Sequence, residues 1–322
     1  MTINLTLFII GLLTLYYSAG WLVKGSSSFA RHVGMQPVVI GLTVVAFGTS
    51  APELVVSLVS SIKGKSMIAV GNIIGSNICN IALVLGMTAI FQPIKSHPSV
   101  IKRDIPIMIG ISLYLLVISF NATIGRYEGL SLICGIVLYI FYNYRIAARG
   151  SYPETGAISS DMKEMTYIAS PPKQLLWIVI GIAGVVIGAD ILIDSAVKIM
   201  EVFGVSEKFI GLTVVAFGTS LPELATSVVA AMRKELDISI GNLIGSNVFN
   251  ILAVLGAATL ANPISIPGGL IDSGLVIDYA VMTATSALPL IMMKNTYILS
   301  RKDGAILLLC YLGYMVYLVL KS

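Results

Sequence analysis

Two glutamates lie in parts of the chain where a charged residue is unexpected. Glu53 ends the segment GTSAPE and Glu223 ends the segment GTSLPE, and both segments lie inside long apolar runs. A carboxylate buried in such a run is costly, so each glutamate is a candidate functional group. Two glutamates held close together would repel each other unless a cation or a proton lay between them. Carboxylate, carbonyl and amide oxygens are the ligands that calcium prefers, whereas zinc and copper prefer histidine or cysteine. The residue types therefore indicate a site for a hard cation.

The residue before each glutamate is a proline, which predicts a break in the helix. Pro52 and Pro222 have no N–H to donate, and their rings clash with the carbonyl four residues earlier. Unpaired carbonyls at membrane depth persist only where they are buried in protein or line a wet cavity, and a cation would satisfy them. The carbonyls that we expect to be freed are those from Ala46 to Thr49 and from Ala216 to Thr219.

A second motif supplies further oxygen ligands at helical spacing. GNIIGSNICN at residues 71–80 recurs as GNLIGSNVFN at residues 241–250. Positions i, i+4 and i+8 of a helix share one face, so the polar residues of each copy form a stripe. We favour Ser76, Asn80, Ser246 and Asn250 as ligands. For Asn72, Asn77 and their counterparts, hydrogen bonding between packed helices is an equally good explanation.

The composition places these motifs in a membrane. The 322 residues are 57% hydrophobic and only 11% charged, too few charges to surround a soluble core. Ten apolar runs are each about the 20 residues that a helix needs to cross a bilayer. We therefore expect an all-α integral membrane protein with ten transmembrane helices, the second and seventh of them broken at the prolines. The runs cover residues 5–24, 38–62, 66–94, 104–121, 128–146, 174–199, 208–232, 238–262, 275–293 and 304–320.

The two motifs belong to an internal repeat with a constant offset of 170 residues. Residues 41–86 and 211–256 share 27 identities in 46 positions. Each copy occupies the second and third spans of a five-span half, and because five is odd, the halves must cross the membrane with opposite polarity. Inverted repeats are typical of secondary transporters, whose substrate site lies near the midplane where the halves meet. We expect a first repeat at 1–146, a cytoplasmic linker at 147–173 and a second repeat at 174–322.

The basic residues predict the orientation, because short loops rich in lysine and arginine remain in the cytoplasm. With the N-terminus outside, 14 of the 20 basic residues lie in inner loops and 6 lie outside. The expected location is the cell membrane, with both termini extracellular.

The paired GTS(A/L)PEL and GNxIGSNxxN blocks resemble the two alpha repeats of the calcium/cation antiporter superfamily, in particular its sodium/calcium exchanger branch. The resemblance implies sodium/calcium exchange by alternating access, electrogenic in character, with spans one and six sliding across a core of spans two, three, seven and eight. It also implies four ion sites arranged as a diamond, with Glu53 and Glu223 shared by the central sites.

The same resemblance implies the remaining ligands. The carbonyls of Ala46 and Thr49 with Ser76 would form one outer corner for sodium, and those of Ala216 and Thr219 with Ser246 would form the other. The residues implied to line the centre are Ser50, Ser220, Asn80 and Asn250. Some archaeal members have an aspartate at the position of Asn250. Here both central positions are amides, which leaves two formal negative charges and weakens the case for a middle sodium ion.

Other functions differ in the coupling ion or in class. A proton-coupled calcium exchanger would also use two buried carboxylates, but that branch has GNxxE in place of GTSxPE, whereas a potassium-coupled exchanger stays open. A cation channel fits the composition but needs no pair of crossed glutamates. The sequence lacks the motifs of an intramembrane hydrolase, so we expect no enzyme. We expect no cofactor beyond the transported calcium and sodium ions, no nucleic-acid partner, and a monomer in the lipid bilayer.

Overall fold

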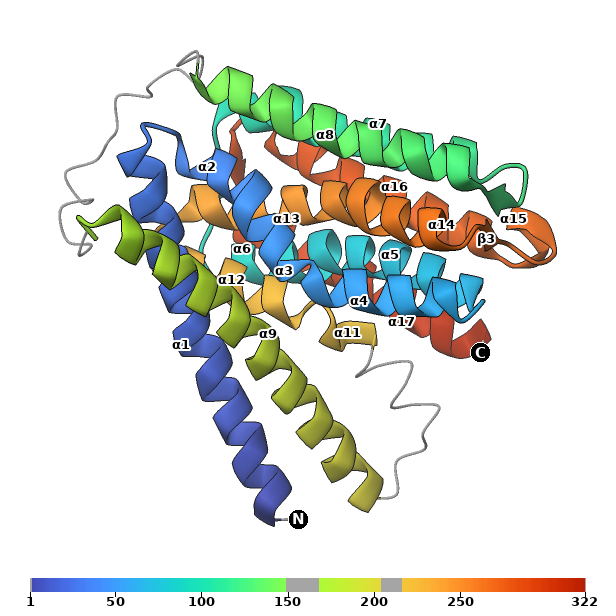
Figure 1. Ribbon diagram of the computed structural model, residues 1–322, viewed down its shortest axis with the longest axis horizontal. Coiled ribbons are helices and arrows are strands. Elements are labelled where there is room, and N and C mark those ends of the chain that lie inside the picture. The colour runs from blue at the N-terminus through green and yellow to red at the C-terminus, as the bar shows by residue number, and fades with distance from the viewer. Residues whose placement is uncertain (1, 149–167, 204–215, 322) are drawn as a thin grey trace.

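The computed structural model describes residues 2–148, 168–203 and 216–321, and nearly all of them are helical (Figure 1). Most of the predicted linker, and residues 208–215 of the predicted seventh span, lie outside the described residues. The elements of the first half, with π-helical turns labelled η, are α1 (Thr2–His32), α2 (Pro37–Ile40), η1 (Gly41–Val45), α3 (Ala46–Thr49), α4 (Ala51–Ile62), α5 (Ser66–Ile78), η2 (Cys79–Leu85), α6 (Gly86–Phe91), β1 (Ile94–Lys95), η3 (Val100–Asp104), α7 (Ile105–Ile118), β2 (Thr123–Ile124) and α8 (Arg126–Ala148).

The second half repeats this order after a 170-residue offset. Helices α5 and α13 both lead into a π-helical turn and then into a helix of 6 residues. Its elements are α9 (Pro171–Val202), α11 (Ala216–Gly218), α12 (Leu221–Met232), α13 (Leu236–Phe249), η6 (Asn250–Leu255), α14 (Gly256–Ala261), β3 (Ile264–Ser265), α15 (Gly269–Asp272), α16 (Leu275–Met293), β4 (Ile298–Leu299) and α17 (Arg301–Lys321).

Short antiparallel strands connect the two halves. Strand β1 pairs with β4, with Ile94 opposite Leu299, and β2 pairs with β3, with Ile124 opposite Ile264. Each pair therefore takes one strand from each half, which ties the ends of the two halves together.

Seven described helices are long and apolar enough to cross a membrane. Segments Pro37–Thr49 and Ala51–Ile62, which meet at a bend of 47°, make an eighth if they are counted as one broken span. Helices α7 and α12 are shorter, with 14 and 12 residues. The protein is thus a mostly helical, multi-span membrane protein, while the count of ten spans stays a prediction.

The helix break expected before Glu53 is present. Helix α3 ends at Thr49, Ser50 leaves helical geometry at φ −80° and ψ 8°, and α4 begins with Pro52 in its first turn. Ser220 has nearly the same geometry before α12. The expectation that the Ala46 carbonyl loses its helical partner is wrong, because the N–H of Ser50 still donates to it at 3.0 Å. A carbonyl has two lone pairs, so this oxygen keeps one for a cation.

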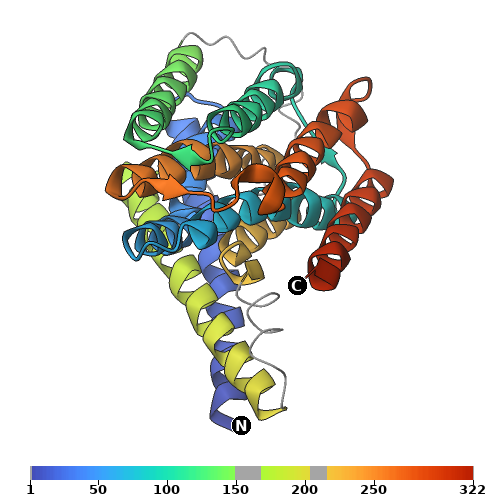
Figure 2. The ribbon, with the colours of Figure 1, turned by 90° about the vertical axis from the view of Figure 1, so that its right-hand side faces the viewer.

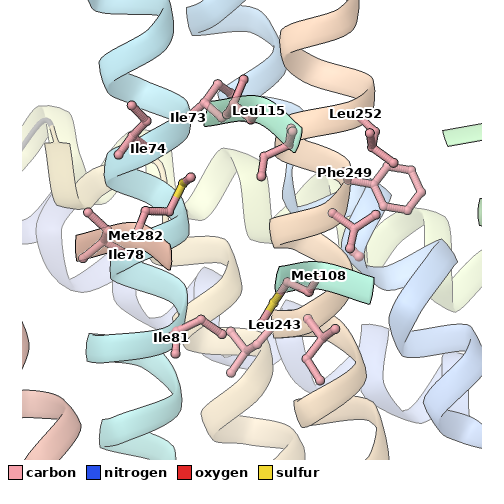
Figure 3. Packing of buried hydrophobic residues seen from close by; sticks show 14 of the residues in the cluster. Ile73, Ile74, Ile78, Ile81, Met108, Leu115, Leu243, Phe249, Leu252 and Met282 are labelled. Atoms are coloured by element: carbon pink, nitrogen blue, oxygen red, sulfur yellow. The ribbon is translucent and has the colours of Figure 1, made fainter. Parts of the chain in front are cut away.

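The core is built around the two helices that carry the second motif, α5 and α13. Figure 3 shows isoleucines of α5 and η2 facing Leu243 of α13, with Met108 of α7 and Met282 of α16 filling the space between them. Helix α13 also crosses η1 closely: a Cβ built on Gly245 would lie 2.6 Å from the carbonyl oxygen of Leu42. These contacts hold the broken segment α2–α3 of the first half against α13 of the second.

Helices α1 and α9 form an antiparallel pair at the edge of the bundle. The start of α1 and the end of α9 project beyond the other helices in both views (Figures 1 and 2). Glycines allow close contact along the pair, since a Cβ on Gly11 would lie 2.8 Å from the Leu192 nitrogen and one on Gly181 would lie 2.6 Å from the Leu22 nitrogen. These two contacts are equivalent under the 170-residue offset, so the offset holds in this helix pair as well.

A histidine outside the spans predicts a pH-dependent stability. His97, in the loop before η3, has its Nε2 3.4 Å from Oδ2 of Asp237 at the start of α13. The hydrogen bond to Asp237 raises the pKa of His97, and partial burial opposes this shift without cancelling it. The stabilisation is therefore complete below the ordinary histidine pKa and is lost as pH rises through the raised pKa of the folded state. It amounts to no more than about 1 kcal/mol, because the pair is partly exposed to solvent.

Melting temperatures measured in detergent on both sides of neutral pH test this expectation. His97→Gln should remove the acid-side stabilisation, and His32→Gln, at the exposed end of α1, should retain it. An unchanged pH profile in His97→Gln would refute the assignment.

Candidate functional site

The two predicted glutamates are buried in the centre of the molecule. Glu53 and Glu223 begin the helices after the two breaks, and both side chains are fully inaccessible to solvent. Neither forms an ion pair with a described lysine, arginine or histidine. A buried carboxylate without a cationic partner is a costly arrangement, so the site requires a positive charge from a bound ion or a proton.

Many oxygens around the glutamates have no hydrogen-bond partner among the described residues. They are Oε1 and Oε2 of Glu53, Oε2 of Glu223, Oγ of Ser76 and Ser220, Oγ1 of Thr219, and Oδ1 of Asn80 and Asn250. Buried polar atoms are almost always paired in native proteins, so a group of unpaired ones indicates an absent ligand. All are oxygens, and oxygens are the donors that calcium and sodium take. The residues present therefore fit a hard cation.

The outer corners are paired differently from the arrangement that the resemblance implied. The Thr49 hydroxyl lies 3.3 Å from Oγ of Ser246, and Thr49 and Ser246 both lie beside Glu223. Ser76 and Thr219 instead lie beside Glu53, outside hydrogen-bonding geometry. Grouping Thr49 with Ser76, and Thr219 with Ser246, is therefore wrong. The reason is the crossing of the halves: α3 packs on α13, and α11 packs on α5.

The remaining predicted ligands also gather at this crossing. The Ser50 hydroxyl donates to Oε1 of Glu223 at 3.3 Å, and Ser220 is buried at the equivalent break. The Ala46 carbonyl lies 3.4 Å from the Thr49 hydroxyl. Ala216 begins α11, and its side chain lies outside the described residues. The structure thus brings the predicted residues from both halves to one place.

A quartet of asparagines positions the two central amides. Asn80 donates through Nδ2 to Oδ1 of Asn247 at 3.1 Å, and Asn250 donates to Oδ1 of Asn77 at 3.1 Å. Asn77 and Asn247 each donate in turn to the other's backbone carbonyl at 3.3 Å. Because the amide groups of Asn80 and Asn250 are used in this way, their Oδ1 atoms stay free for a ligand. The sequence left the role of Asn77 open, and its three-residue spacing from Asn80 in both copies was the available signal.

Two further asparagines have a packing role. Asn72 donates to Oγ of Ser57 at 2.9 Å, and Asn242 donates to Oγ of Ser227 at 3.2 Å. Each bond joins the helix that follows a break to the next helix, so the two halves use the same fixing contact. Asn242 also accepts from the Thr49 hydroxyl at 3.1 Å, which links it to the site.

Comparison with known proteins agrees with this geometry. A family model described as "Sodium/calcium exchanger protein" matches residues 3–146 and 173–320. "Putative antiporter CaxA" of Alkalimonas amylolytica is 38% identical over 322 residues, covering 98% of this chain and 99% of that protein. "Sodium/calcium exchanger MaX1" of Methanosarcina acetivorans is 30% identical over 350 residues, covering 99% of both. The structure of the sodium-calcium exchanger NCX_Mj soaked with Na⁺ and Ca²⁺ matches with a TM-score of 0.83 at 32% identity, covering 98% of each chain.

Proposed function

Because the chain belongs to the sodium/calcium exchanger family, we propose that it exchanges sodium for calcium across the cell membrane by alternating access. The observation that carries the proposal is the cluster of buried, unpaired oxygens around Glu53 and Glu223. Two carboxylates balance one calcium ion or a group of sodium ions, so the two loads compete for the same oxygens. Competition of this kind couples the movement of one ion to the return of the other.

We assign the ligands by their positions at the crossing. Calcium would take the two glutamates and the free oxygens of Asn80 and Asn250. Sodium would occupy a corner at each break, bounded by hydroxyls from both halves. One corner would contain the Ala46 carbonyl, Thr49, Ser50 and Ser246, and the other the Ala216 carbonyl, Thr219, Ser220 and Ser76. If the charges of bound sodium exceed those of calcium, exchange is electrogenic.

The proposed arrangement in the membrane consists of two inverted five-helix repeats, 1–146 and 174–322, with the segment 147–173 as a cytoplasmic linker. The constant 170-residue offset between equivalent elements supports this arrangement. Both chain termini would then lie outside the cell.

Calcium uptake into proteoliposomes tests the proposed function. Vesicles loaded with sodium, with potassium or with a low-pH buffer are diluted into radioactive calcium, with and without a potassium-clamped membrane potential. Uptake that requires internal sodium and responds to potential supports electrogenic sodium/calcium exchange. Uptake driven by internal protons or potassium identifies another coupling ion, and uptake without any opposing gradient identifies a channel.

Removing a corner hydroxyl should weaken sodium binding selectively. Ser246→Ala and Ser76→Ala each delete one neutral ligand, worth about 0.5–1.5 kcal/mol, so half-saturating sodium should rise roughly 2–10-fold. Calcium affinity should change less, because the carboxylates remain. Ser112→Ala is the control, since Ser112 is buried but bonds only to the Met108 carbonyl of its own helix. Equal weakening of sodium and calcium by both corner variants would contradict the assignment.

A further inference from the structure

A buried ion pair joins the edge helix α1 to the central bundle. Nη2 of Arg31 lies 2.7 Å from Oε1 of Glu235, which also accepts from the Ser27 hydroxyl at 2.5 Å. Arg31 donates to the same hydroxyl at 2.6 Å. The Glu235 side chain is 8% exposed. Exposed pairs contribute little, but leaving a buried carboxylate such as this one without its partner is strongly unfavourable.

The pair fixes only one end of α1. Glu235 lies in the turn between α12 and α13, at the end of the bundle that the predicted orientation places in the cytoplasm. In the same turn Arg233 packs its guanidinium against α1 at Gly20. The other end of α1 projects from the bundle, where Ile3 is 70% exposed (Figure 1). The helix is therefore closed onto the bundle on the inner side and separated from it on the outer side.

The repeat places a second pair of charges at the equivalent positions on the opposite side. Adding 170 to Arg31 gives Glu201 in the last turn of α9, and subtracting 170 from Glu235 gives Lys65 in the turn between α4 and α5. Both signs are reversed, so the two residues remain complementary. Lys65 is exposed and forms no ion pair with any described residue.

The contacts of α9 with the two breaks are unequal, which indicates a second arrangement. Gly48 packs against Ile182, and Gly218 packs against Ile193. The equivalent of the first contact would join Gly218 to Leu12, and the equivalent of the second would join Gly48 to Val23. Exchanging the roles of the two halves therefore produces a different position of the α1–α9 pair on the same bundle. In that arrangement α9 would take the place at the outer turn that α1 has at the inner turn.

We propose that Arg31–Glu235 and Glu201–Lys65 are alternating ion pairs that position the α1–α9 pair at either end of its movement. Arg31–Glu235 closes the inner side in the arrangement seen here, and Glu201–Lys65 closes the outer side in the reverse arrangement. The proposal rests on alternating access as the proposed function. A pair on one side alone would bias the protein toward one arrangement, whereas one pair on each side keeps the two arrangements close in free energy.

Charge reversal tests whether each pair acts as a pair. Arg31→Glu alone places two like charges together and should slow sodium-driven calcium uptake about tenfold or more. The double variant Arg31→Glu with Glu235→Arg should recover to within about threefold of the parent. The same rescue should occur for Lys65→Glu with Glu201→Lys. Lys302→Glu, an exposed charge at the start of α17, is the control and should not change the rate.

Crosslinking tests the alternation itself. In a background with Cys79, Cys134 and Cys310 replaced by alanine, cysteines at 31 and 235, or at 65 and 201, are treated with a short bifunctional thiol reagent. Each crosslink should block exchange, and conditions that favour one crosslink should disfavour the other. Failure of the double swaps to rescue, or a 65–201 pair that never crosslinks in protein that exchanges ions, would overturn the proposal. Absence of sodium-driven uptake in the parent protein would instead overturn the proposed function.

Discussion

Proteoliposomes containing Glu53→Gln or Glu223→Gln should show no sodium-driven calcium uptake above background. The substitution keeps the shape of the side chain and removes one of the two negative charges in the site. Removing one partner from a buried charge interaction costs about 3–5 kcal/mol, which corresponds to a loss of calcium affinity on the order of 100- to 1,000-fold. Both glutamates are fully buried and lack a described cationic partner, so the bound ion is the charge that each would lose.

The control is Asp272→Asn, which removes an exposed carboxylate in α15. It should exchange calcium at the parent rate, and all three variants should elute as the parent does in size-exclusion chromatography. Folded glutamate variants that retain sodium-driven uptake would show that the carboxylates are not the ion ligands.

Gly245→Val should destabilise the protein more than any other single change discussed here. A Cβ at this position would lie 2.6 Å from the Leu42 carbonyl oxygen and 2.8 Å from the Cβ of Ala46. Backbone atoms cannot move aside as a flexible side chain can, so α13 would have to separate from η1. Overpacking of this kind costs roughly 3 kcal/mol, equivalent to a fall of about 5–10 °C in melting temperature. The same separation would move Thr49 away from Ser246 and weaken ion binding.

Gly313→Val is the matched control, because Gly313 lies on an exposed face of α17 and an added Cβ there meets no described atom within 4 Å. Its melting temperature should stay within a few degrees of the parent. A Gly245→Val protein that melts at the parent temperature would show that the close crossing of α13 and η1 is not required.

Features that depend on neighbouring residues could be predicted from the sequence. The break before Glu53 follows from proline chemistry within one turn, and the structure has the bend at that residue. The membrane setting follows from apolar runs whose length matches a bilayer, and the repeat is visible as a fixed offset between identical residues. Family membership follows from the same local blocks, because they carry the specific residue types of the site.

Features that depend on how the halves cross required the tertiary structure. The partner of Thr49 is Ser246, 197 residues away, and not the serine of its own half. The partners of Asn80 and of Arg31 are likewise 167 and 204 residues distant. Helical periodicity shows which residues share a face of one helix, but it contains no information on which helix that face meets. The sequence by itself thus determined the ligand types and the helix breaks, whereas packing of α13 against η1 and α3 decided which oxygens meet around each glutamate, because that choice depends on the close approach of two backbones far apart in the chain.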